Sequence, residues 1–134
     1  MEIKEKYELA LKAQKNSYAP YSKFKVGAVL LFNDGSYELG CNVENASYGL
    51  CNCAERTAMF KAISNGKNLK EVKELIVIAP APRPVSPCGA CRQVMSELLN
   101  KDVKITMFNM NMDYKVTTVE ELLPYAFTED DVNG

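Results

Sequence analysis

Two pairs of cysteines carry the clearest chemical signal in this chain. Cys51 and Cys53 flank one asparagine in the stretch LCNCAERTAMF, and Cys88 and Cys91 form a Pro-Cys-x-x-Cys segment. The chain contains five cysteines, an odd number, and no histidine. Without histidine, no Ser-His or Cys-His nucleophile pair can exist, whereas thiolates are preferred zinc ligands. The pattern therefore predicts a cysteine metal site rather than a disulfide framework.

The spacing of the cysteines leaves two kinds of zinc site open. Four cysteines in two close pairs (Cys51, Cys53, Cys88 and Cys91) suit a closed structural site, whereas a catalytic site uses three protein ligands and leaves the fourth position to water. Cys53 and the second pair each precede a predicted helix. Helix N-termini stabilise thiolates because positive partial charge and unpaired N–H groups gather there. Cys41 belongs to neither pair and suits a small buried hydrophobe.

Glu55 favours the catalytic alternative. It follows Cys53 in the first turn of a predicted helix, where its carboxylate can reach a water or substrate bound to the same ion. A site with an open position needs such a group, whereas a structural site does not. The competing interpretation is an acidic residue favoured by the helix dipole. Arg56, the next residue, can donate hydrogen bonds to a ligand thiolate, or instead form a surface ion pair.

Composition limits the partners that we expect. The chain has 134 residues, of which 47% are hydrophobic and 25% are charged, and this balance predicts one globular domain over residues 1–134. A net charge of −1 offers no electrostatic footprint for DNA or RNA. The longest apolar run, residues 28–32, is too short to cross a bilayer, and the charged N-terminus does not resemble a signal peptide. We therefore expect a cytoplasmic protein with no nucleic-acid or membrane partner.

Alternating helical and β patterns must position these residues. Helical spacing and a capping box at Thr118 predict helices over residues 3–16, 54–63, 94–99 and 118–123. β-prone apolar runs predict strands over residues 26–32, 37–43, 75–79, 103–108 and 114–116. Because strands and helices alternate in the middle of the chain, we expect an α/β fold with helices on both faces of a sheet.

The cysteine segments resemble the motif of a known enzyme family. Cys53-Ala54-Glu55 followed by Pro87-Cys88-x-x-Cys91 resembles the signature of zinc-dependent nucleoside and nucleobase deaminases, with cysteine in place of histidine. This variant is similar to the small homotetrameric cytidine deaminases. Further similar segments cover nearly the whole chain: residues 19–28, 40–48, 86–93 and 121–124. The resemblance implies a three-layer α/β/α sandwich with a mixed central sheet of about five strands.

The resemblance also implies an activity and a role for each matching residue. The activity would be deamination of cytidine and deoxycytidine to uridine and deoxyuridine, with release of ammonia, in pyrimidine salvage. Cys53, Cys88 and Cys91 would hold one Zn²⁺ per subunit, and Glu55 would transfer protons. The residues that would contact the nucleoside are Phe24, Asn42, Glu44, Ala54 and Phe127, the last of which would reach a neighbouring subunit's site.

Two of these contacts are also plausible from the residues themselves. Asn42 and Glu44 alternate with Val43 near a strand end, so both side chains can point to one side and bind ribose hydroxyls. Without the resemblance, both would be assigned to a polar loop edge. Phe24 would then be assigned to the core rather than to nucleoside binding.

Two alternatives to a cytidine deaminase remain. Blasticidin-S deaminase resembles the metal motifs and the length, although Phe24 and residues 42–48 fit cytidine deaminase better. A non-enzymatic zinc domain with four cysteine ligands is the alternative from a different class. That domain would need Cys51 and not Glu55, whereas the enzyme would need Glu55 and not Cys51.

Overall fold

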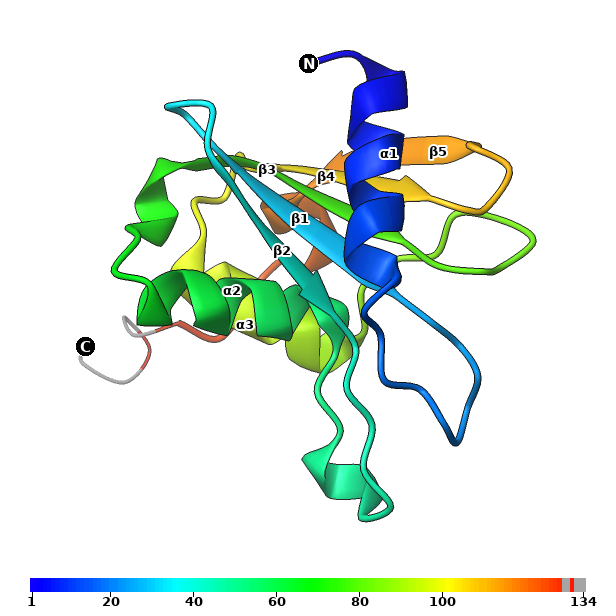
Figure 1. The fold of residues 1–134 in the computed structure, drawn as a ribbon. Helices are drawn as coiled ribbons and strands as arrows, with labels where there is room; N and C mark the ends of the chain where they lie inside the picture. The colour runs from blue at the N-terminus through cyan, green and yellow to red at the C-terminus, as the bar shows by residue number, and fades with distance from the viewer. Residues whose placement is uncertain (129–130, 132–134) are drawn as a thin grey trace.

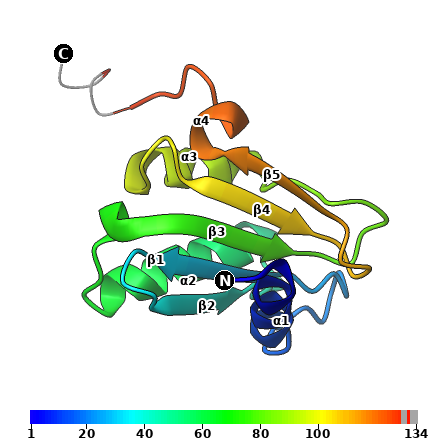
Figure 2. The same cartoon turned by 90° about the horizontal axis from the view of Figure 1, so that it is seen from above.

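Five strands form one mixed sheet at the centre of the molecule (Figure 2). The computed structural model describes residues 1–128 and residue 131. The strands lie in the order β2-β1-β3-β4-β5. Their bounds are β1 (Gly27–Phe32), β2 (Tyr37–Cys41), β3 (Val72–Ile78), β4 (Lys104–Phe108) and β5 (Tyr114–Thr118). Because β3 and β4 are parallel and the other neighbours antiparallel, the prediction of a mixed five-stranded sheet is confirmed.

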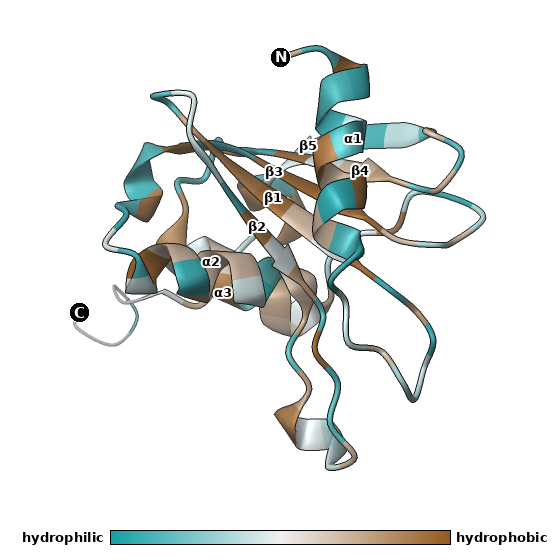
Figure 3. Ribbon diagram, viewed as in Figure 1, coloured by the Kyte–Doolittle hydropathy of each residue, from teal (hydrophilic) through white to brown (hydrophobic). Residues whose placement is uncertain are grey.

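Helices cover both faces of this sheet (Figure 1). They are α1 (Ile3–Gln14), α2 (Ala54–Ser64), α3 (Gly89–Leu98) and α4 (Val119–Leu122). Val29 and Leu31 of β1 pack in the core on the α1 side, while Ala28 and Leu30 pack in the core on the α2 and α3 side. Both faces of β1 are therefore buried, as its unbroken apolar run indicates (Figure 3). The predicted three layers are confirmed.

The largest differences between the predicted and observed element boundaries are at the starts of β3 and α3. Strand β3 begins at Val72 and so includes Glu74, which is buried. Its carboxylate lies 2.8 Å from Lys6 Nζ and accepts a hydrogen bond from Thr106 at 2.6 Å, so the charge is paired inside the sheet. Helix α3 begins directly after Cys88 and not near Val94, because its first turn has no apolar repeat to mark it.

Glycine at position 40 allows α2 to lie directly on β2. A Cβ atom at Gly40 would stand 2.5 Å from the main-chain nitrogen of Ala58 and 2.6 Å from the carbonyl oxygen of Ala54. Both atoms belong to the backbone of α2, so no side-chain rotation can relieve the overlap. Because Cys53 and Glu55 stand at the start of α2, Gly40 sets how far these two residues lie from the sheet.

Helix length also bears on membrane association. The longest helix in the described part of the chain, α1, has 12 residues, whereas a bilayer-spanning helix needs about 20. Among residues 1–128 and 131, no helix is long and apolar enough to cross a membrane.

Candidate active site

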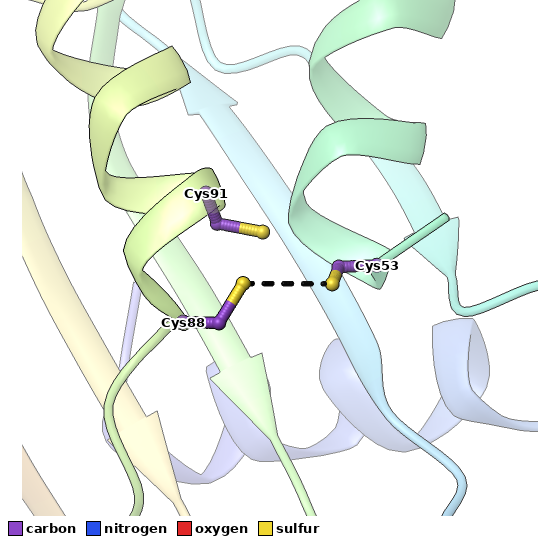
Figure 4. Close-up of side chains that lie close together, drawn as sticks. All are labelled: Cys53, Cys88 and Cys91. Atoms are coloured by element: carbon purple, nitrogen blue, oxygen red, sulfur yellow. Dashed lines mark hydrogen bonds between the residues drawn. The ribbon is translucent and has the colours of Figure 1, made fainter. Parts of the chain in front are cut away.

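Three sulfur atoms meet where α2 and α3 begin (Figure 4). Cys53 is the N-cap residue of α2, Cys88 is the N-cap residue of α3, and Cys91 lies in the first turn of α3. Their Sγ atoms all lie within 4.8 Å of one another, and those of Cys53 and Cys88 are 3.7 Å apart. A disulfide requires about 2.05 Å, so the thiols are free.

The spacing of these sulfurs fits a zinc ion. Two thiolates bound tetrahedrally to zinc at about 2.3 Å lie about 3.8 Å from each other. The separation of 3.7 Å between Cys53 and Cys88 matches that edge of a tetrahedron. Three cysteine ligands would leave the fourth corner open, which is the arrangement of a catalytic site.

The protein stabilises negative charge on Cys53. A hydrogen bond with Cys91, supported by another from Arg56, lowers the pKa of the Cys53 thiol to about 5. The same hydrogen bond, together with burial, raises the pKa of Cys91. Arg56 donates from Nη2 to Cys53 Sγ at 3.4 Å, whereas its Nε is buried with no hydrogen-bond partner among the described residues. These contacts therefore favour the thiolate form of Cys53, which is the form that binds metal.

Cys51 and Cys41 lie outside this cluster. The Sγ atom of Cys51 accepts a hydrogen bond from the Asn45 N–H at 3.3 Å and so closes the loop of residues 45–51. Among the residues that the structure describes, the group of adjacent metal-ligating side chains contains Cys53, Cys88 and Cys91 without Cys51. Cys41 ends β2, and burial raises the pKa of its thiol. The geometry thus favours a three-cysteine site over a four-cysteine one.

Cys53 and Cys88 border a cleft of about 470 Å³, a size within the range of small-molecule sites. Its lining brings together residues from both halves of the chain. Predicted site residues in the lining are Phe24, Asn42, Glu44, Cys53, Ala54, Glu55 and Cys88. Cys91 is fully buried, and neither it nor Arg56 belongs to the lining.

Glu55 combines burial with access to the cleft. Its exposed fraction is only 4%, yet it belongs to the lining. Burial raises the pKa of its carboxyl group to about 7, and the negative charge of Cys53 adds to this effect. A cation held by the thiolates would oppose the shift. A carboxyl group in this position can accept and return a proton beside the cleft.

Asn42 organises one wall of the cleft. Its Oδ1 accepts hydrogen bonds from the Val26 N–H at 2.9 Å and from the Ser17 hydroxyl. Its Nδ2 donates to Phe24 O at 2.8 Å, and its second amide hydrogen has no acceptor among the described residues. The side chain therefore holds the Phe24 segment in place and keeps one donor for a ligand.

Glu44 likewise forms hydrogen bonds within the protein and keeps an acceptor position for a ligand. Its carboxylate accepts hydrogen bonds from the N–H groups of Tyr21 and Ser22, at 3.0 and 3.1 Å, and from the Ser22 hydroxyl. The Ser22 hydroxyl is the main cause that lowers the pKa of Glu44, so the group is ionised. A carboxylate offers about four acceptor positions, and one therefore remains for a ligand.

Of the two aromatic residues predicted to contact the nucleoside, Phe24 lines the cleft and Phe127 does not. Phe24 lines the cleft and is partly exposed, at 40%. Phe127 is 62% exposed and is not among the lining residues of its own chain, where Gln93 donates to its carbonyl oxygen at 2.8 Å. Its role at a neighbouring subunit therefore stays a prediction.

Sequence reasoning assigned no role to several polar residues of the lining, namely Ser22, Asn52 and Ser86. Serine and asparagine are ordinary loop residues, so their types alone gave no signal. Ser22 was detectable only through its hydrogen bonds to Glu44, which lies far along the chain. Such pairing requires the fold.

Comparison with known proteins decides the family. Residues 1–107 match the model of the cytidine and deoxycytidylate deaminase zinc-binding region. The chain belongs to the cytidine and deoxycytidylate deaminase family. It is accordingly an enzyme of the hydrolase class, and the family prediction made from the cysteine motifs is confirmed.

Relatives and solved structures agree with this assignment. A cytidine deaminase of Halalkalibacterium halodurans is 55% identical over 92% of this chain and 92% of its own length. One of Sporosarcina psychrophila is 47% identical over 99% of this chain and 96% of its own. The crystal structure of cytidine deaminase from Burkholderia pseudomallei has a TM-score of 0.92 and 50% identity, and the match covers 95% of this chain and 100% of that one.

Proposed function

We propose that this enzyme catalyses the zinc-dependent hydrolysis of cytidine and deoxycytidine to uridine and deoxyuridine in cytoplasmic pyrimidine salvage. The observation that carries the proposal is a group of three sulfurs beside one cleft, whose lining includes Cys53, Cys88 and the buried Glu55. Relatives at 55% and 47% identity bear the name cytidine deaminase, which supports the choice of substrate.

Cys53, Cys88 and Cys91 would hold one zinc ion per subunit. When bound there, zinc would make a water molecule available as a nucleophile near neutral pH. Three thiolates outweigh the charge of Zn²⁺, so the protein must draw electron density away from the sulfurs. The Arg56 hydrogen bond to Cys53 Sγ and the two helix N-termini support that role.

Glu55 would carry the protons of the reaction. It would take a proton from the attacking water, pass it to ring N3, and later deliver one to the departing amino group. An O–C4 bond forms and the C4–N bond breaks, so ammonia leaves with no change of oxidation state. The main-chain N–H of Ala54 and the Glu55 carboxylate would face the pyrimidine edge, and both residues belong to the cleft lining.

Asn42 and Glu44 would orient the sugar. Asn42 keeps one free N–H donor and Glu44 keeps one free acceptor position after their contacts within the protein. A hydroxyl group donates one hydrogen bond and accepts others, so a single ribose hydroxyl can satisfy both residues. This capacity supports turnover of both ribonucleoside and deoxyribonucleoside. Phe24 would pack against the nucleoside from the same wall.

Exposed apolar side chains support the proposed homotetramer. Phe60 and Ile63 on α2 are 44% and 47% exposed. Tyr48 and Leu50 are 89% and 70% exposed, and their segment projects from the body of the molecule (Figure 1). Burying these side chains against further copies of the chain would be favourable, and Phe127 would then be available to a neighbouring site.

The ultraviolet spectrum of cytidine incubated with purified, metal-analysed protein tests the proposal. We expect the spectrum to convert to that of uridine while ammonia accumulates, and blasticidin S to be turned over far more slowly. Glu55→Gln keeps the shape of the side chain and should retain zinc while turnover falls by about 100-fold to 10,000-fold. An unchanged cytidine spectrum with zinc-loaded protein would refute the proposal, and faster turnover of blasticidin S would transfer it to that substrate.

A further inference from the structure

Arg92 makes an unusual set of contacts around one of the three cysteines. Its Nε donates to Pro87 O at 2.8 Å, its Nη1 to Leu122 O at 3.0 Å, and its Nη2 to the Ser86 hydroxyl. The main-chain N–H of Arg92 also donates to Cys88 O at 2.9 Å. Arg92 therefore binds the carbonyl oxygens of Pro87 and Cys88, which lie just before and just after the Cys88 nitrogen and Cα atoms.

Cys88 needs this support more than the other two cysteines do. Cys91 is fully buried in the hydrophobic core, and Cys53 receives a direct hydrogen bond from Arg56. Cys88 is exposed, forms no side-chain capping bond, and ends the proline-rich loop of residues 80–87. Pro87 before it is buried and its sulfur contacts that of Cys53, but Cys88 itself lies in no strand. The Arg92 hydrogen bonds are therefore contacts that restrain its main chain.

The same guanidinium joins the loop to the end of α4. Helical side chains lean toward the helix N-terminus, so Arg92, in the first turns of α3, lies over the residues that precede the helix. A planar guanidinium can donate to three separate acceptors at once, whereas the single nitrogen of lysine cannot match that fork. The contact with Leu122 O braces the loop against a third segment.

We infer that Arg92 is a positioning residue for Cys88 and controls how long the metal stays in the site. The inference rests on the proposed zinc site, because Cys88 must be a ligand for its position to matter to a metal. Loss of the three side-chain hydrogen bonds would free residues 86–88 to move, and Cys88 would leave the ion more often. Partners of metal ligands typically change metal affinity by about 10-fold to 100-fold.

Zinc release from the loaded enzyme measures this effect directly. The protein is mixed with excess chromogenic chelator well below its Tm, and the rate of zinc transfer is recorded. We expect Arg92→Met to release zinc about 10-fold to 100-fold faster than the unmodified protein. Arg92→Lys should also release it faster, since it keeps the charge but not the fork. In the cobalt-substituted protein, both variants should weaken the thiolate-to-cobalt absorption bands.

Two control variants separate positioning from general destabilisation. Arg83→Met removes an exposed arginine from the same loop. The Arg83 side chain forms no hydrogen bond with the residues that the structure describes. Asp34→Ala removes the carboxylate that accepts from the Ser36 N–H at 2.9 Å in the turn between β1 and β2, and so lowers stability away from Cys88. Both should release zinc at the unmodified rate.

Each outcome decides the inference. If Arg92→Met does not fold, Arg92→Lys carries the test alone. Release from the Arg92 variants at the unmodified rate, or no faster than from Asp34→Ala, overturns the inference. An unmodified protein that binds no zinc overturns both the inference and the proposed function. Zinc-loaded protein that deaminates nothing overturns only the proposed function, since metal release still reports on Arg92.

Discussion

Replacing Gly40 with alanine should displace the first turns of α2. The new Cβ atom would meet Ala58 N at 2.5 Å, about 0.9 Å short of the 3.4 Å at which ordinary contact begins. Because the opposing atoms are main-chain atoms, α2 must move from β2 by a similar distance. Cys53 and Glu55 move with the helix and so shift relative to Cys88 and Cys91 at the start of α3.

The expected costs follow from that displacement. Overpacking of a close contact typically costs about 1–3 kcal/mol, which corresponds to a Tm lowered by roughly 4–12 °C in a chain of this size. A misplacement of about 1 Å at a catalytic group costs roughly 100-fold in rate. Gly40→Ala should therefore lower activity far more than it lowers the fraction of folded protein at 25 °C.

Calorimetry of the zinc-loaded protein and the ultraviolet assay of cytidine turnover measure the two effects. Gly89→Ala is the matched control, because it makes the same substitution in the other cysteine-bearing helix, where a Cβ atom meets nothing within 4 Å. It should preserve activity and leave Tm equal or higher, since alanine is the better helix former. Gly40→Ala with the Tm and turnover of the unmodified protein would show that the helix position does not limit the site.

Three further predictions test the assigned residues. Cys51→Ala should keep zinc and activity, whereas Cys53→Ala should lose both; loss of zinc from the Cys51 variant by metal analysis would favour the four-cysteine alternative. Arg56→Gln should lower turnover roughly 10-fold because a hydrogen bond to the Cys53 sulfur is lost, and unchanged activity at full zinc occupancy would reject that role. Deoxycytidine should match cytidine in kcat/KM within about 10-fold, while 2′,3′-dideoxycytidine should fall by about 100-fold, because one hydroxyl satisfies Asn42 and Glu44; equal turnover of all three would remove the sugar contact.

The fold was predictable from the sequence where the pattern of burial is simple. Strand β1 is buried along its whole length and therefore stands out as a continuous apolar run. Strand β3 was shortened in the prediction because Glu74 interrupts its apolar run. Its pairing with Lys6 spans 68 residues, and no local pattern contains that information. Buried charges are compatible with a strand only when a distant partner is known.

The candidate site, like the fold, was predictable from the sequence only in part. Residue type and short spacing predicted a metal site among Cys51, Cys53, Cys88 and Cys91, and the family resemblance implied the last three as ligands. The structure brings the sulfurs of those three together. The exclusion of Cys51 depends on its hydrogen bond with Asn45, a contact that spacing did not reveal. The contacts that support the site from a distance also required the three-dimensional arrangement.

Each of the three cysteines is held in place by a different physical means. Cys53 depends on the contact between α2 and β2 at Gly40, because the start of α2 carries the sulfur. Cys91 depends on core packing, and Cys88 depends on the hydrogen bonds of Arg92. Because these restraints differ, we expect a change in one of them to move one sulfur relative to the others. A metal bound by three sulfurs is sensitive to such relative motion, so residues that never enter the cleft can still govern its chemistry.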